Sequence, residues 1–188
     1  MGCSIYWFRA DLRLLDNPQF VNACQHSQSL LPVFVFPQPE QTPWGFERAS
    51  KQRALWLHQN LCNLRSSLEK KGSTLLVLEG EPKNVLSALC IEVGADVIYC
   101  EAIAAPEEQS DILELQRAGL TINTQWQSTM LDPKTLGMDV QELPDVFTNF
   151  RQVVEKRRLR YAEPVARPQS IPPLPAKLAK QDPISELT

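Results

Sequence analysis

The chain has 188 residues, of which 43% are hydrophobic and 22% charged, enough for one globular domain with an appendage. It contains no run of about 18 apolar residues and no signal-peptide pattern, so we expect a cytoplasmic protein without a membrane span. Five cysteines without a C-x-x-C pair argue against a disulfide framework and a zinc site. We expect these cysteines to be reduced and buried.

Five nearly continuous apolar runs predict strands that are buried on both faces, as parallel strands are. These runs cover residues 3–8, 30–36, 74–79, 96–100 and 120–125. Helical patterns alternate with these runs. Three of the predicted helices begin at Asn17-Pro18, at Pro82 and at Pro106, and the remaining one carries an apolar stripe of Leu57, Leu61, Leu64 and Leu68. Right-handed crossovers then predict an α/β fold, a Rossmann-like, five-stranded doubly wound parallel sheet in the order 3-2-1-4-5.

After residue 125 the alternation ends. Residues 126–143 are expected to form a loop, and residues 145–158 a trailing helix capped by Asp145, with an apolar face of Val146, Phe147, Phe150, Val153 and Val154. Six prolines between residues 163 and 183 predict an extended, partly disordered linker or tail. We therefore divide the chain into an α/β domain (1–130), a loop and amphipathic helix (131–162), and a proline-rich tail (163–188).

A basic cluster overlaps this helix and tail. Residues 151–168 carry six basic and two acidic side chains, a segment charge of +4, which leaves −7 on the rest of the chain. Such a cluster fits either a nucleic-acid contact or a solvated helix end. The acidity of the remainder argues against a broad DNA-binding surface.

In a doubly wound sheet, ligands bind beyond the carboxyl ends of the strands, where the strand order reverses. The loops predicted at that point are 9–16 and 101–108. The first holds four charges, Arg9, Asp11, Arg13 and Asp16, which either line a ligand site or pair with one another and cap the next helix.

Several chemistries lack their motifs. There is no G-x-G-x-x-G turn, no P-loop and no G-x-S-x-G elbow, and the two histidines have no neighbours in metal-ligand spacing, so no catalytic and no metal-binding residue is assigned. Glu107 and Glu108 could serve as acid and base groups, but the dipole of a first helical turn also explains them. For Trp7 and Trp56 we expect core packing.

Three segments carry a resemblance to the DNA photolyase and cryptochrome family, and to its DASH subgroup in particular. The segment "WFRADLRLLDNPQF" resembles the family's N-terminal signature, and "RALWLHQNLCNLRSSLEKKGSTLLVLEGEP" its second helix and third strand. The segment "LPDVFTNFRQVVEK" is similar to the part that follows the α/β domain in the DASH subgroup. The similarity covers roughly residues 3–165.

The resemblance implies an antenna role for this domain. Glu107 matches the family glutamate that binds the pterin of methenyltetrahydrofolate, Arg53 matches an arginine near a deazaflavin antenna, and Arg9 lies in the rim turn. Half the walls of the folate site come from the family's larger helical domain, so we expect weak binding of this or another antenna chromophore. That helical domain also holds FAD, which is not expected in this chain alone.

The sequence therefore predicts an antenna-domain half that supports blue-light-driven DNA repair or photoreception only together with an FAD-binding helical domain. The alternative is a stand-alone binding or protein-interaction domain without light chemistry. We expect the helix at 145–158 to meet the FAD-binding domain or a second copy of the chain, and DNA to be contacted only indirectly.

Overall fold

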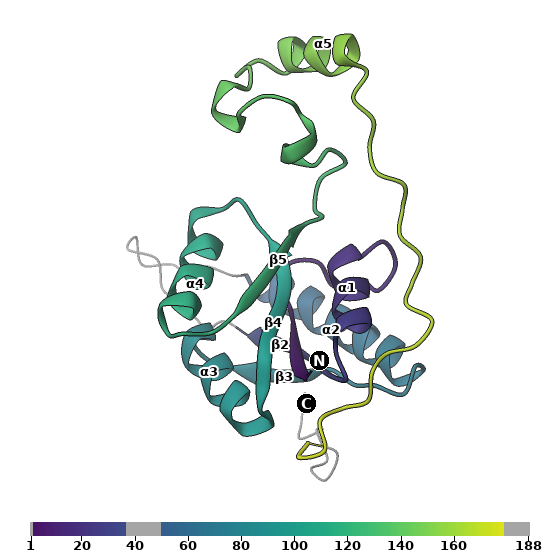
Figure 1. Cartoon of the computed structure of the whole chain (residues 1–188), viewed down its shortest axis with the longest axis vertical. Coiled ribbons are helices and arrows are strands. Elements are labelled where there is room, and N and C mark those ends of the chain that lie inside the picture. The colour runs from purple at the N-terminus through teal and green to yellow at the C-terminus, as the bar shows by residue number, and fades with distance from the viewer. Residues whose placement is uncertain (1, 37–49, 179–188) are drawn as a thin grey trace.

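The computed structural model describes residues 2–36 and 50–178, and at its centre lies one parallel sheet in the order β3-β2-β1-β4-β5 (Figure 1). The strands are β1 (Cys3–Phe8), β2 (Ser29–Phe36), β3 (Leu76–Glu79), β4 (Ala95–Ala102) and β5 (Ile122–Trp126). In the central strand, Trp7 pairs with Val33 of β2 on one side and with Cys100 of β4 on the other. The predicted fold class and strand order are confirmed.

Two helices cover each face of the sheet. The helices are α1 (Pro18–His26), α2 (Lys51–Glu69), α3 (Pro82–Val93) and α4 (Pro106–Arg117). α1 and α2 pack on one face, and α3 and α4 on the other (Figure 1). Among the described helices, none combines the length and the apolar composition that crossing a bilayer requires.

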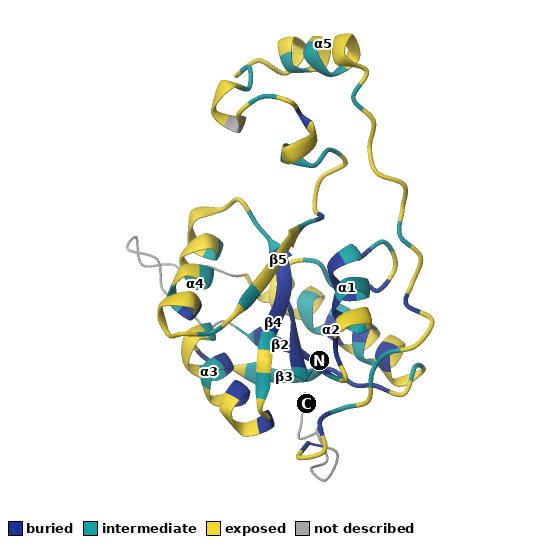
Figure 2. Cartoon of the chain, viewed as in Figure 1, coloured by how far each residue is buried: buried dark blue, intermediate teal, exposed yellow. Residues whose placement is uncertain are grey.

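The alternation of side chains along β1 divides the core in two. Ile5 and Trp7 belong to the cluster beneath α3 and α4, whereas Tyr6 and Phe8 belong to the cluster beneath α1 and α2. Both sets are at most 4% exposed, so this strand is buried on both faces as its sequence predicts (Figure 2).

Local signals set the ends of these helices. Asn17 caps α1, accepting a hydrogen bond from the backbone N–H of Phe20 at 2.9 Å, and Pro18 occupies the first helical position. α3 ends at Gly94, whose φ of 67° lies in the left-handed region that glycine adopts without steric cost.

Three expectations about burial were wrong. β3 and β5 are the edge strands, and neither is buried on both faces: no residue of β3 is buried, and residues 123–125 of β5 are exposed. Trp7 is buried as predicted, but Trp56 is 60% exposed, because it lies one residue away from the helical stripe that faces the core. Of the five free cysteines, Cys90 and Cys100 are buried and Cys62 is exposed.

Residues 128–164 form a lobe beyond the sheet, in which helix α5 (Phe147–Arg157) follows two 3-10 turns, Pro133–Thr135 and Val140–Glu142 (Figure 1). The expected loop therefore contains short helical turns. Asp145 does not cap α5: Val146 occupies the capping position, without a side-chain hydrogen bond. None of the residues of α5 is buried.

The proline-rich segment is extended, as predicted, but through residue 178 it is docked on the α/β domain. The backbone N–H of Leu30 donates to Pro173 O at 3.0 Å, and Lys71 Nζ donates to Pro168 O at 2.9 Å. Ile171 packs on the core beneath α1 and α2, whereas Leu178, 6% exposed, joins the core beneath α3 and α4. Up to this residue the segment is part of the packed structure. The remainder of the expected tail lies outside the described residues.

Candidate functional site

The candidate site lies at the carboxyl ends of β1 and β4, where the strand order reverses. Arg9 directly follows β1, and Glu101 is the next-to-last residue of β4. The first turn of α4 begins after the same end of β4 and carries Glu107 and Glu108. This is the edge at which doubly wound sheets place their ligands.

Arg9 ties β1 to α4. Its side chain is only 5% exposed, and Nη2 donates to Asp111 Oδ2 and to the backbone oxygen of Glu108, both at 3.0 Å. The guanidinium carbon lies 4.5 Å from the centre of the Trp7 ring, within the range of a cation–π contact. Arg9 therefore fixes the first turns of α4 against the sheet.

The other two predicted site residues lie on different faces of the sheet. Glu107 is exposed in the first turn of α4, adjacent to the residue whose carbonyl accepts from Arg9. Arg53 is exposed near the start of α2, which packs on the opposite face. The structure thus brings Glu107 close to the Arg9 contact and places Arg53 on a separate helix.

Glu101 is a buried carboxyl group that the sequence reading missed. The residue is 2% exposed, and burial raises the pKa of Glu101 to about 7, with a further increase from the nearby Asp11 charge. A hydrogen bond from the Asp11 backbone and the positive charges of Arg9 and Arg13 act in the opposite direction. The sequence signal for it is an acidic residue within the apolar run of residues 97–102, which continues past residue 100, where the predicted strand ends.

Several polar atoms at this edge are buried without a hydrogen-bond partner among the described residues. They are Arg9 Nη1, Glu101 Oε2 and Glu108 Oε2, a cationic donor and two carboxyl oxygens. Buried polar groups in native proteins are nearly always hydrogen-bonded. This edge therefore holds three charged-group atoms that are shielded from solvent and whose hydrogen-bonding capacity no described residue uses.

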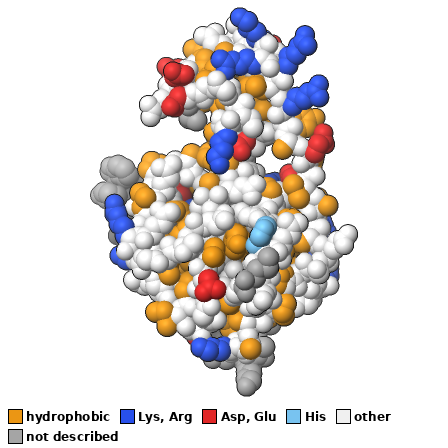
Figure 3. Space-filling model, viewed as in Figure 1, with side chains coloured by type: hydrophobic (Ala, Val, Ile, Leu, Met, Phe, Trp, Pro, Cys, Tyr) orange, Lys and Arg blue, Asp and Glu red, His pale blue; other side chains and the backbone are white. Residues whose placement is uncertain are grey.

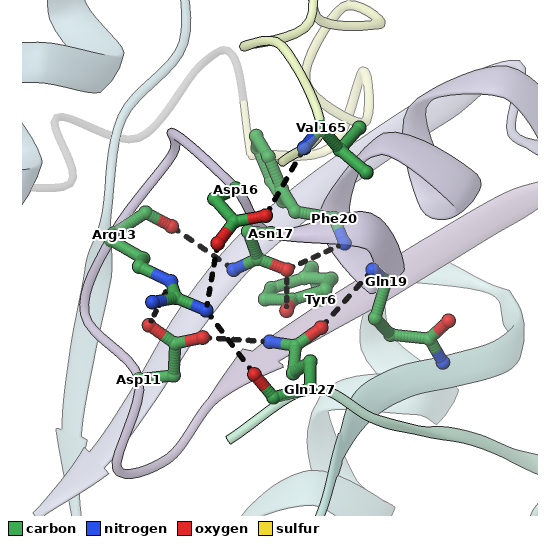
Figure 4. Close-up of polar contacts among 9 residues, drawn as sticks. All are labelled: Tyr6, Asp11, Arg13, Asp16, Asn17, Gln19, Phe20, Gln127 and Val165. Atoms are coloured by element: carbon green, nitrogen blue, oxygen red, sulfur yellow. Dashed lines mark hydrogen bonds and ion pairs between the residues drawn. The ribbon is translucent and has the colours of Figure 1, made fainter. Parts of the chain in front are cut away.

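The charged turn after β1 is held together by its own side chains, and helix α1 begins from it (Figure 4). Tyr6 Oη donates to Asn17 Oδ1 at 2.9 Å, and Asn17 Nδ2 donates to Arg13 O at 3.0 Å. Arg13 Nε pairs with Asp11 Oδ1 at 3.1 Å. Of the four charged residues of this turn, Arg13 therefore pairs with Asp11 and Asp16, whereas Arg9 pairs with Asp111 of α4. The cap of α1 is Asn17 and not one of the four.

Within residues 2–36 and 50–178, no three His, Cys, Asp or Glu side chains are grouped so that they could hold a metal ion.

Comparison with known proteins agrees with this fold. The family model described as DNA photolyase matches residues 4–173. Cryptochrome DASH of Natronomonas pharaonis is 30% identical over 92% of this chain, and the chloroplastic/mitochondrial cryptochrome DASH of Arabidopsis thaliana is 34% identical over 83%. The chain spans 37% and 29% of these two relatives, respectively.

Solved structures give the same result. A cryptochrome from Synechocystis sp. PCC6803 superposes with a TM-score of 0.88 and 30% sequence identity. The match covers 94% of this chain and 38% of the cryptochrome chain. A class III photolyase from Agrobacterium tumefaciens gives a TM-score of 0.76 and 26% identity, covering 100% and 39%. The resemblance inferred from the three sequence segments is confirmed, and the chain belongs to the DNA photolyase family, whose N-terminal α/β domain it matches.

Proposed function

We propose that this chain is the antenna-domain portion of a DASH-like photolyase or cryptochrome. In this proposal it supports blue-light-driven repair or photoreception together with an FAD-binding helical domain, located in the same polypeptide or in another. The family match supports the proposal, as does the fact that the chain spans only 29–39% of the relatives and solved structures named above. The observation that carries the proposal is the edge of β1 and β4, where unsatisfied buried polar atoms lie beside the helix turn bearing Glu107.

The proposed ligand is methenyltetrahydrofolate, bound through its pterin ring. A pterin offers amino and ring N–H donors, and a carboxylate such as that of Glu107 accepts from both. Arg9 contributes by holding the first turns of α4 in place through Asp111 and Glu108. When bound, the chromophore would absorb light and pass the excitation to the flavin. Arg53 lies on the other face of the sheet, away from this site, and is a candidate only for a different, deazaflavin-type antenna.

The proposed partner surface is the exposed face of the lobe. Val146 is 57% exposed and Phe147 75% exposed, which is unusual for large apolar side chains on one short segment. Figure 3 shows hydrophobic and basic side chains next to one another over this lobe. We assign this face to the FAD-binding helical domain, because the relatives contain the additional chain length that such a domain requires.

Titration of the purified chain with methenyltetrahydrofolate, followed by absorption spectroscopy and equilibrium dialysis, tests the antenna assignment. We expect weak, saturable binding that Glu107→Ala abolishes and Glu107→Gln reduces, because Gln retains one acceptor oxygen but loses the charge. Glu114→Ala is the matched control, an acid on the same helix two turns further on. If the chain binds no folate, deazaflavin or flavin, the antenna function is contradicted and the interaction domain becomes the better assignment.

A further inference from the structure

The lobe of residues 128–164 leaves the α/β domain after Gln127 and returns to it at Val165. We call Gln127 the outgoing root of the lobe and Val165 its returning root. Both roots contact the same short turn, residues 11–16 (Figure 4). Gln127 and Val165 are more than 110 and nearly 150 residues from that turn along the chain. One local turn therefore contacts the chain where it enters the lobe and where it leaves it.

The outgoing root is fixed by three hydrogen bonds to Gln127. Its Nε2 donates to Asp11 Oδ2 at 2.9 Å, its backbone oxygen accepts from Arg13 Nη2 at 3.2 Å, and its Oε1 accepts from the backbone N–H of Gln19 at 3.1 Å. The residue is 9% exposed. A buried amide with its donor and acceptor both occupied has one defined orientation.

The returning root is fixed by a reciprocal pair of bonds. The backbone N–H of Asp16 donates to Val165 O at 2.8 Å, and the backbone N–H of Val165 donates to Asp16 Oδ1 at 3.1 Å. Asp16 has a φ of 53°, in the left-handed region that is uncommon for residues other than glycine but that Asp and Asn tolerate. The contacts that surround this conformation are the two bonds to Val165 and the ion pair of the Asp16 carboxylate with Arg13.

Arg13 links the two roots. Its Nε lies 3.1 Å from Asp11 Oδ1, on the outgoing side, and its Nη2 lies 3.9 Å from Asp16 Oδ2, on the returning side. Beneath it, the buried Tyr6–Asn17 hydrogen bond anchors the turn to the sheet. The two roots and the core thus meet in one connected polar network.

We propose that the turn of residues 11–16 is a two-point clamp that fixes the orientation of the lobe relative to the α/β domain. The clamp makes the lobe and the sheet tumble as one body, and its loss frees the lobe while leaving the sheet folded. That the oriented lobe serves to meet an FAD-binding domain rests on the proposed function. The clamp itself is a property of this chain and is measured without any ligand or partner.

The test is ¹⁵N relaxation of the full chain, comparing the rotational correlation time of α5 amides with that of amides in β1, β4 and α3. In the wild type we expect one common value. In the double variant Asp16→Ala/Gln127→Ala, both roots lose their side-chain contacts, and we expect the value for α5 to fall to roughly half that of the sheet. Each single variant, which leaves one root fixed, should show a smaller fall.

Two further variants separate the contact from the backbone conformation. Asp16→Asn keeps an acceptor oxygen and tolerates positive φ, so the lobe should remain fixed. Asp16→Gly relieves the backbone conformation but removes the acceptor, so the lobe should loosen even though the turn is easier to form. Glu92→Ala, an exposed acid on α3, is the control for loss of charge.

Independent tumbling of α5 in the wild type, or a double variant indistinguishable from the wild type, would overturn the clamp. If the double variant does not fold, the single variants and Asp16→Gly still decide, because each of them leaves the side-chain contacts of one root in place. The two proposals fail separately. A chain that binds no chromophore can still show clamped tumbling, and a chain with a freely moving lobe can still bind folate at Glu107.

Discussion

In the α/β domain, Phe20, Leu86 and Ile98 are at most 1% exposed, whereas α5 in the lobe has no buried residue and Phe147 is 75% exposed. The helices of the two regions have similar sequence patterns, since those of the α/β domain and α5 each carry an apolar stripe. The stripes of the α/β domain meet two sides of a sheet, which gives each of them a surface to pack on. In α5, Phe150, Val153 and Val154 are only half-buried, and Phe147 is exposed.

An amphipathic pattern therefore predicts a helix but not the surface against which the helix packs. In the α/β domain, burial of apolar area stabilises the structure directly. In the lobe, the contacts that define its position are polar and lie at its roots, at Gln127 and Val165. Mutations should therefore have large effects on stability in the first region and small effects in the second.

The largest expected effect is that of removing a core aromatic ring. Phe20 is fully buried and its ring centre lies 4.9 Å from that of Tyr6, so Phe20→Ala should lower the free energy of unfolding by about 3–5 kcal/mol. The matched change in the lobe, Phe147→Ala, should cost less than about 0.5 kcal/mol, because an exposed ring loses little burial. Urea unfolding of both variants checks this. Equal losses would contradict the distinction between the regions.

The next effect is a pH dependence from Glu101. Because the pKa of Glu101 is about 7 in the folded chain against 4.5 when unperturbed, the folded chain holds an extra proton between these pH values. The free energy of unfolding should then fall by about 2–3 kcal/mol as the pH rises through this range, and change no further above it.

Glu101→Gln cannot titrate and should lack this component. Urea unfolding of both proteins at about pH 5 and about pH 8 should show the variant gaining stability relative to the wild type at the higher pH, by the 2–3 kcal/mol given by linkage. A constant difference between the two proteins would show that Glu101 is ionised at both pH values, and that its burial does not act as described.

A smaller effect is expected where the C-terminal segment docks. Leu178 is 6% exposed in the core beneath α3 and α4, and Leu178→Ala should cost about 2 kcal/mol, at the low end for a buried leucine because the segment that carries it has no regular secondary structure. Lys177→Ala, at an exposed neighbour, is the control. If both changes are neutral in urea unfolding, the docked segment does not belong to the α/β domain.

The smallest expected effects concern thiol reactivity. Burial raises the pKa of Cys24 and Cys100 to about 12 and that of Cys90 to about 11, so these thiols should be nearly inert in the native chain at neutral pH. Cys62 is exposed and should react first with a disulfide reagent. Mass spectrometry of partially labelled protein identifies the reacting residue, and early labelling of Cys100 would contradict its burial.

The sequence allowed the fold to be predicted because its signals are local. Apolar runs, the Asn17-Pro18 cap and the stop at Gly94 each act over a few residues, and handedness rules then determine the strand order. The burial of β5 was overestimated because an edge strand and a central strand can have similar composition. The docking of the proline-rich segment was missed because its composition indicates an extended chain but not the surface it contacts.

The candidate site was less accessible to sequence reasoning. Arg9 and Glu107 were assigned from a motif, but the bonds from Arg9 to Glu108 and Asp111 join residues about 100 positions apart. The contacts of Asp16 with Val165 and of Asp11 with Gln127 have similar or larger separations. No periodicity records such pairs, so only the folded chain reveals them.

The most direct test of the antenna assignment is to map the binding site with ¹H–¹⁵N correlation spectra of the chain during titration with methenyltetrahydrofolate. We predict that the shift changes concentrate at the carboxyl ends of β1 and β4 and in the first turn of α4, around Arg9, Glu101 and Glu107. Changes centred near Arg53 on α2, or on the lobe, would place the ligand elsewhere and contradict the assignment. Unchanged spectra at saturating folate would rule out antenna binding by this chain.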